Sequence, residues 1–146
     1  MALQPRICID VADLEKGIAF YRDALGLSPG RRLGKKWAEM LGASAPIDLL
    51  AEPAGTAPVP RSGAVRDYRR HWTPVHLDWP VPDLAAAMRR AEAAGATLES
   101  EVLVKKWGRL ALLADPFGNG FCLLEFQGRG YDELLDFTPR PDGSTS

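Results

Sequence analysis

The sequence is poor in cysteine, in long hydrophobic runs and in excess charge of either sign. Its two cysteines, Cys8 and Cys122, lie far apart and form no Cys-x-x-Cys pair, which indicates a reducing compartment rather than a disulfide scaffold. No apolar run approaches the roughly 20 residues that cross a bilayer, and the first residues lack the basic and apolar segments of a secretion signal. We therefore expect a cytoplasmic protein without a membrane partner.

Neither positive nor negative charge is in excess. The 18 lysines and arginines nearly balance the 19 aspartates and glutamates, for a net charge of −1, so a nucleic-acid partner is not predicted. With 146 residues and 46% hydrophobic residues, the chain can bury one core of ordinary size. A single globular domain follows.

A short pattern is repeated in the chain, 70 residues apart. Asp13-Leu14 recurs as Asp83-Leu84, and Lys35-Lys36-Trp37 recurs as Lys105-Lys106-Trp107. Two matches at one offset predict a duplicated structural unit. Two similar units also predict a small-molecule site at the seam between them.

The first copy has the pattern of a strand, a helix and three strands. Residues 6–11 alternate between polar and apolar, which is typical of a half-buried strand. Asp13 can cap a helix that ends at Gly26. Strand-like pieces broken by glycine and proline then continue to residue 50. The helix presents one apolar stripe, formed by Leu14, Ile18, Tyr21 and Leu25.

The second copy follows the same plan. Residues 74–81 predict its first strand and Asp83 caps its helix. Strands follow at 97–104, 109–114 and 121–126, the last two joined by a turn. The predicted fold class is α+β, with two tandem βαβββ units. Unit one covers 5–53, the linker 54–72 and unit two 73–127. Residues 128–146 form a C-terminal extension, with a short helix over 128–137 and disorder from about 138.

The linker is rich in proline, glycine and alanine, and its end is basic. We interpret it as a solvated connection and leave its arginines outside the predicted site. They are Arg61, Arg66, Arg69 and Arg70.

The order of three motifs resembles the vicinal oxygen chelate superfamily, which includes glyoxalase I, bleomycin-resistance proteins, fosfomycin-resistance enzymes and extradiol dioxygenases. The motifs are Phe20-Tyr-Arg-Asp-Ala-Leu-Gly-Leu27, Val75-His-Leu-Asp78 and Ala114-Asp-Pro-Phe-Gly-Asn119. The resemblance spans residues 5–127 as one glyoxalase/bleomycin-resistance-like domain. It implies a paired, cup-shaped mixed sheet with outer helices, and a homodimer.

In metal-using members of the superfamily, four strand positions bind a divalent ion. The resemblance matches them to Arg6, Asp48, His76 and Cys122. Arg6 cannot be a ligand, because a guanidinium stays protonated, so the resemblance favours a metal-independent protein. The alternative is a zinc, nickel, manganese or iron site formed by Asp48, His76 and Cys122. Glu125 is a further candidate ligand if a bulge shifts the last strand by one residue.

Without a metal, the same positions predict a site for an oxygenated or anionic organic ligand. Arg6 can bind a carboxylate or phosphate, or pair with Asp48. His76 is the candidate general acid or base. Cys122 stands in an apolar run, where cysteine behaves as a small hydrophobic residue. An equally weighted alternative is that these groups are only the polar lining of the sheet.

The two repeated tryptophans, Trp37 and Trp107, could flank a flat ligand. The competing interpretation is that they pack at the margin of a sheet. Two function classes thus remain open. One is a binding protein that holds a small molecule between its units, and the other is a lyase, isomerase or dioxygenase of the superfamily.

Overall fold

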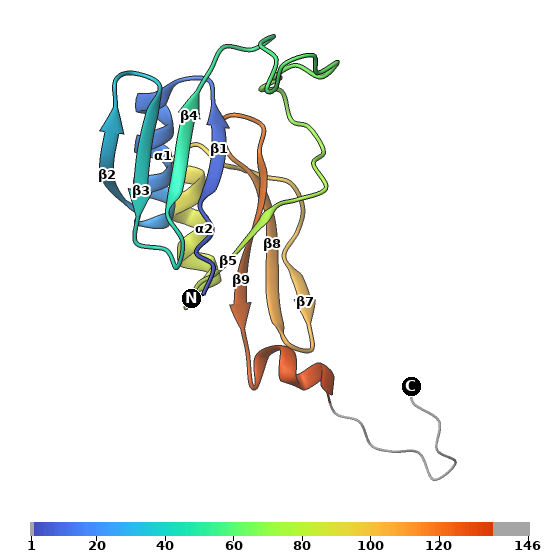
Figure 1. Cartoon of the computed structure of the whole chain (residues 1–146). Coiled ribbons are helices and arrows are strands. Elements are labelled where there is room, and N and C mark those ends of the chain that lie inside the picture. Colours follow the sequence, from blue (N-terminus) through green and yellow to red (C-terminus); the bar gives the residue numbers. More distant parts are fainter. Residues whose placement is uncertain (1, 136–146) are drawn as a thin grey trace.

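The computed structural model describes residues 2–135 and shows two units, each with a mixed sheet and one helix (Figure 1). Unit one comprises β1 (Ile7–Val11), α1 (Leu14–Leu25), β2 (Ser28–Leu33), β3 (Trp37–Leu41) and β4 (Ile47–Ala51). Unit two comprises β5 (Leu77–Pro80), α2 (Leu84–Ala93), β6 (Thr97–Leu98), β7 (Leu103–Lys105), β8 (Gly108–Ala114), β9 (Gly120–Phe126) and a 3₁₀ helix (Gly130–Leu135). The predicted α+β class with two tandem βαβββ units is confirmed.

The two sheets share one topology. The strand order is β1-β4-β3-β2 in unit one and β5-β9-β8-β6 in unit two, where β7 also pairs with β8. In each sheet the first strand runs parallel to the last one and the other pairs are antiparallel. The first strand of each unit therefore has one unpaired edge. β1 and β5 bring these edges toward the seam between the units (Figure 1).

The repeated Asp-Leu pair marks the start of both helices. The Asp13 carboxylate accepts a hydrogen bond from Lys16 N, and the Asp83 carboxylate accepts one from Ala86 N, both at 2.9 Å. Each satisfies a backbone donor that the first helical turn leaves open. α1 ends at Gly26, whose φ of 70° is the left-handed conformation that a C-cap glycine adopts. Local sequence signals therefore determine both ends of α1.

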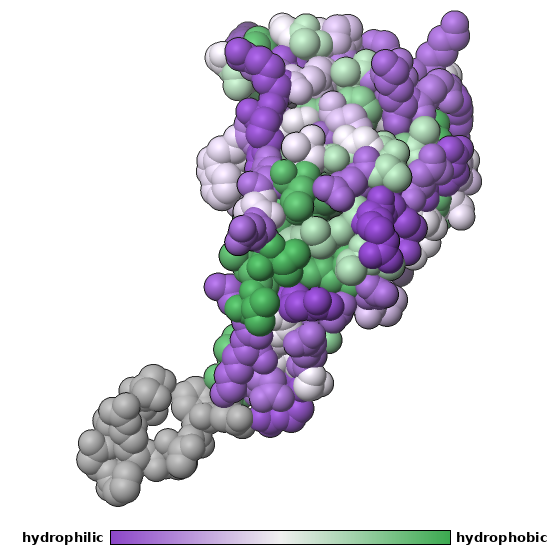
Figure 2. All heavy atoms as spheres, turned by 180° about the vertical axis from the view of Figure 1, so that it is seen from behind, coloured by the Kyte–Doolittle hydropathy of each residue, from purple (hydrophilic) through white to green (hydrophobic). Residues whose placement is uncertain are grey.

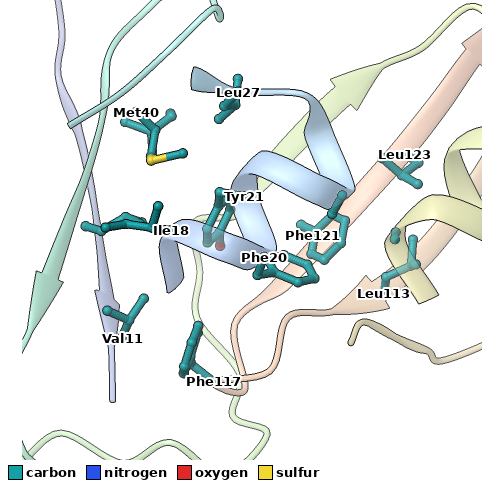
Figure 3. Close-up of a cluster of buried hydrophobic side chains, with 14 of the residues drawn as sticks. Val11, Ile18, Phe20, Tyr21, Leu27, Met40, Leu113, Phe117, Phe121 and Leu123 are labelled. Carbon is teal, nitrogen blue, oxygen red and sulfur yellow. The ribbon is translucent and has the colours of Figure 1, made fainter. Parts of the chain in front are cut away.

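One hydrophobic core spans both units because α1 and α2 pack against each other. Ile47 and Leu49 on β4 are fully buried, whereas Asp48 between them points to the sheet face that carries no helix. Figure 3 shows core side chains from both units in one cluster. Those labelled are Val11, Ile18, Phe20, Tyr21, Leu27, Met40, Leu113, Phe117, Phe121 and Leu123.

Two details differ from the sequence prediction. The single strand predicted over 97–104 is two short strands, β6 and β7, because its register with β8 changes between them. The helix predicted over 128–137 is a 3₁₀ helix at Gly130–Leu135. Residues 136 and 137, and the predicted disorder from about 138, lie outside the described residues. Within residues 2–135, no helix has the length and apolar character needed to cross a membrane.

Candidate functional site

Unit one carries a network of ion pairs on its helix-free sheet face. The Arg6 guanidinium donates to the Asp48 carboxylate at 2.6 and 2.9 Å and to Glu39 Oε2 at 2.6 Å. Arg31 Nη2 donates to the same Glu39 oxygen at 2.7 Å. Both carboxylates are buried. Hydrogen bonds from Arg31 and then Arg6 lower the pKa of Glu39 to about 2. The guanidiniums of Arg6 and Arg31 thus form ion pairs with both carboxylates. One of these is Asp48 of the predicted site.

Glu125, the further candidate ligand, lies on the other face of its sheet. Its Oε2 accepts a hydrogen bond from Leu84 N at 2.7 Å, at the start of α2, and both its oxygens bind Arg109 Nη2. These partners, the Leu84 amide first, lower the pKa of Glu125. No bulge interrupts the pairing of β8 with β9 at this point. The structure therefore separates Glu125 from Cys122.

A group of three potential metal ligands lies on unit two. The ligating atoms of His76, Asp78 and Cys122 lie within 4.8 Å of one another, and within residues 2–135 no other trio of this kind is found. His76 Nε2 is 3.1 Å from Asp78 Oδ1. Asp78 and Cys122 are opposite each other in the parallel pair of β5 and β9. The sequence placed His76 and Asp78 on one strand face, but it did not identify Asp78 as a site residue.

The Cys122 thiol is not a ready nucleophile. Its burial, followed by its hydrogen bond to Asp78, raises the pKa of Cys122 to about 12. A thiol with such a pKa is protonated at neutral pH, and the thiolate is the reactive form. Cys122 is therefore a buried hydrogen-bond donor, and it would have to lose its proton to bind a metal ion.

A large cavity lies at the seam between the units. It has a volume of about 620 Å³ and is bounded by β1, β5, the linker and the turn before β9. Both histidines of the chain, His71 and His76, line it. Most of its wall is apolar, and the aromatic and aliphatic side chains include Ile7, Ile9, Tyr68, Leu77, Trp79 and Phe121.

The linker forms one wall of this seam cavity, contrary to its interpretation as a solvated connection outside the site. Arg66 Nε donates to Asp10 Oδ2 at 2.8 Å, and the Arg66 side chain is only 11% exposed. Tyr68 OH donates to Glu52 O at 2.6 Å. The linker lacks hydrophobic periodicity, so its sequence gave no sign of these contacts. No pattern within the linker indicates them, because the partners, Asp10 and Glu52, belong to unit one.

The two tryptophans of the predicted site lie away from the seam cavity. Trp37 begins β3 and is opposite Leu50 of β4. Trp107 packs against Phe126 and Tyr131, with ring centroids 5.9 and 5.0 Å apart. Neither Trp lines the cavity, and neither do Arg6, Asp48 and Cys122. Of the predicted residues, His76 is the one that reaches it.

The turn before β9 joins unit one, the linker and unit two. The buried Asp115 carboxylate accepts hydrogen bonds from Tyr21 OH of α1 at 2.7 Å and from Asn119 Nδ2 at 2.9 Å. Asn119 Nδ2 also donates to Asp10 O of β1 at 3.1 Å. Gly118 has a φ of 81°, and a Cβ there would lie 2.4 Å from Arg69 O of the linker. The turn therefore fixes one end of the seam cavity.

Comparison with known proteins identifies a matching family and two relatives. A family model described as "Glyoxalase-like domain" matches residues 6–124. The anthracycline biosynthesis protein DauV of Streptomyces sp. (strain C5) is 34% identical over 117 residues, which are 79% of this chain and 38% of DauV. DnrV of Streptomyces peucetius, also an anthracycline biosynthesis protein, is 33% identical and covers 77% of this chain and 37% of its own length. The chain thus spans less than two fifths of these curated relatives.

Solved structures with low sequence identity share the fold. The fosfomycin resistance protein FosX of Listeria monocytogenes superposes with a TM-score of 0.68 at 18% identity, over 92% of this chain and 97% of FosX. A glyoxalase-related enzyme of Fulvimarina pelagi gives a TM-score of 0.65 at 18% identity, over 100% of this chain and 98% of that enzyme. With the family model covering both units, the resemblance to the vicinal oxygen chelate superfamily is confirmed, and the chain belongs to the glyoxalase-like domain family.

Proposed function

We propose that the protein binds a small, largely apolar, oxygenated organic molecule in the seam cavity and needs no metal ion to do so. The observation that carries this proposal is the cavity itself, with a volume of about 620 Å³ between β1, β5 and the linker. Cavities of roughly 300–1,000 Å³ hold molecules of drug size. Their walls are mostly apolar and a few polar groups orient the ligand.

The polar groups of the cavity suit an oxygenated ligand. His76 can donate a hydrogen bond to a ligand oxygen or accept one from a ligand hydroxyl. Asp78 Oδ1, 3.1 Å from His76 Nε2, can fix the orientation of the ring or stabilise its protonated form. The Asp10–Arg66 ion pair lies in the wall and is already satisfied. The cavity therefore offers His76 as a partner for a polar atom and as its candidate acid or base.

A flat aromatic compound is the ligand class that we favour. Tyr68, Trp79 and Phe121 give the cavity aromatic walls, which bury flat rings well. The relatives DauV and DnrV are named as anthracycline biosynthesis proteins, and anthracyclines contain fused oxygenated rings. These names support the ligand class and leave the individual compound open.

Calorimetric titration with emodin, a hydroxylated anthraquinone, tests the proposal on chelator-treated protein. Val65 of the linker is 57% exposed and lines the cavity. Val65→Trp would fill part of it, and we expect an affinity loss of at least about tenfold, equivalent to about 1.4 kcal/mol. Val59→Trp is the matched control, because Val59 is a linker valine that is 58% exposed and does not line the cavity.

The titration can contradict the proposal in two ways. Equal affinity of Val65→Trp and wild-type protein would place the ligand elsewhere. Binding that disappears on chelator treatment and returns with a metal ion would show that ligand binding depends on the metal. Unchanged circular dichroism spectra of both variants confirm that the comparison concerns folded protein.

We also propose that the protein is a homodimer. The helix-free face of the unit-two sheet carries Leu103, Leu110 and Leu112, which face one way across β7 and β8. Leu103 is 37% exposed. Figure 2 shows hydrophobic side chains gathered over unit two in the lower half of the molecule. An apolar sheet face that no helix covers is a candidate interface, and a second copy is the partner that the family resemblance implies.

Light scattering after gel filtration tests the dimer. We expect a mass of twice 15.9 kDa for the wild type and a shift toward the monomer for Leu103→Lys, which places a charge on the apolar face. Val104→Lys is the control, because Val104 is opposite Arg109 on the other face of the strand pair and is already 76% exposed. A monomeric wild type, or equal effects of both variants, would refute the proposed interface.

A further inference from the structure

We propose that His76, Asp78 and Cys122 form a binding site for zinc or a similar borderline-soft divalent ion, built within unit two alone. This inference goes beyond the ligand binding proposed above and does not depend on it. It starts from the one group of three described side chains whose potential ligand atoms lie within 4.8 Å of one another.

The backbone places the three side chains on one face. His76 precedes Asp78 by two residues, so strand alternation gives both the same orientation. Asp78 is opposite Cys122 in the parallel pair of β5 and β9, and opposite residues of neighbouring strands also share a face. A buried strand, β9, thus holds the thiol. The edge strand β5 brings the Asp78 carboxylate beside it, and the imidazole comes from His76, the residue just before β5.

The distances suit a tetrahedral ion after small side-chain movements. Zinc binds nitrogen, oxygen and sulfur at about 2.0–2.3 Å, so neighbouring ligand atoms lie roughly 3.3–3.8 Å apart. The trio falls within 4.8 Å, and His76 Nε2 lies 3.1 Å from Asp78 Oδ1. The side chains of His76 and Asp78 are 46% and 44% exposed. They are therefore free to rotate toward an ion beside the buried Cys122.

The donor set selects the class of ion. Thiolate and imidazole favour zinc over magnesium or calcium, which prefer oxygen ligands. One carboxylate and one thiolate balance the two positive charges of the ion, so the loaded site is neutral. Such a site avoids the cost of a buried net charge. When bound, the ion would supply Lewis-acid character toward an oxygen atom.

Three protein ligands leave one coordination position open. His76 and Cys122 both line a second cavity of about 140 Å³, next to Trp72 and Leu112. His76 also lines the larger seam cavity. An ion held by the trio would therefore lie at the boundary between the two cavities. Its open position can be filled by water or by an oxygen of a bound molecule.

This site differs from the four-position pattern of the superfamily. In unit one, Arg6 stands at one of those positions and holds Asp48 at the other. These two positions of unit one therefore supply no ligand, and Asp78 supplies the third ligand from within unit two. The competing explanation is a hydrogen-bonded trio that holds no ion, in which Asp78 accepts from the Cys122 thiol. Metal titration separates the two.

The test is titration of the metal-free full-length chain with Zn²⁺ and with Co²⁺. We expect one ion per chain, a rise in melting temperature on adding Zn²⁺, and a thiolate-to-cobalt absorption band in the near ultraviolet. Cys122→Ser should abolish that band. His76→Ala and Asp78→Asn should each weaken binding at least about tenfold. Both are exposed positions, so these variants also decide the question if Cys122→Ser does not fold.

The chain supplies matched controls, because it has one other histidine and one other cysteine. His71→Ala and Cys8→Ser should bind both ions as the wild type does. Absence of stoichiometric binding, cobalt binding without the thiolate band, or loss of binding in the Cys8→Ser control would overturn the proposed site. The emodin titration is done with chelator present, so failure of the metal site leaves that result untouched.

Discussion

At the scale of single residues, Glu39 makes a testable contribution to acid stability. Arg31 and Arg6 lower its pKa to about 2, below the value of about 4.3 for an unfolded glutamate. The stabilisation is therefore fully present above about pH 4.5 and is lost as the pH falls toward about 2. Urea unfolding at about pH 5 and about pH 3 measures this loss. Glu39→Gln should lose less stability over that interval than the wild type.

Other carboxyl groups also titrate in this range, so the difference between variant and wild type is the informative quantity. Glu101→Gln is the control, because Glu101 is exposed and its replacement should leave the acid loss unchanged. If Glu39→Gln and the wild type lose equal stability on acidification, Arg31 and Arg6 do not lower the pKa of Glu39.

The sequence predicted which face each site residue occupies more reliably than which neighbour it contacts. Alternation along residues 6–11 and 74–81 separated Arg6 from Ile7, and His76 from Leu77, correctly. The sequence allowed for an Arg6–Asp48 pair, which the structure contains. It could not show Glu39 joining that pair, because the register between β3 and β4 is not encoded locally. The contact of Asp78 with Cys122 was missed for the same reason.

At the scale of elements, the sequence was most informative where the cause is local. Asp13 and Asp83 start helices because a carboxylate satisfies nearby backbone amides. The split of residues 97–104 into β6 and β7 was not predicted, because it depends on pairing with a distant strand. The linker shows the same limit, since Arg66 and Tyr68 are positioned by unit-one partners 56 and 16 residues away in the sequence.

At the scale of the whole molecule, the seam between the units determines the candidate ligand site. The repeat predicted that a seam exists. The 620 Å³ cavity depends on how β1, β5 and the linker meet there. Those contacts run through the turn before β9, where Tyr21 of α1 reaches Asp115 across 94 residues of sequence. Both residues are buried, so this hydrogen bond is shielded from water.

The Tyr21–Asp115 hydrogen bond should therefore couple the stability of the two units. Tyr21→Phe keeps the ring in the core but removes one donor to a buried carboxylate, which costs about 1–3 kcal/mol. We expect that loss in urea unfolding, together with faster amide hydrogen exchange in both α1 and the turn before β9. Tyr131→Phe is the control, because Tyr131 is 48% exposed and its replacement should change stability by less than about 0.5 kcal/mol. Faster exchange confined to α1 would mean that the units are held together by apolar packing of α1 on α2, and that the hydrogen bond plays no part in their coupling.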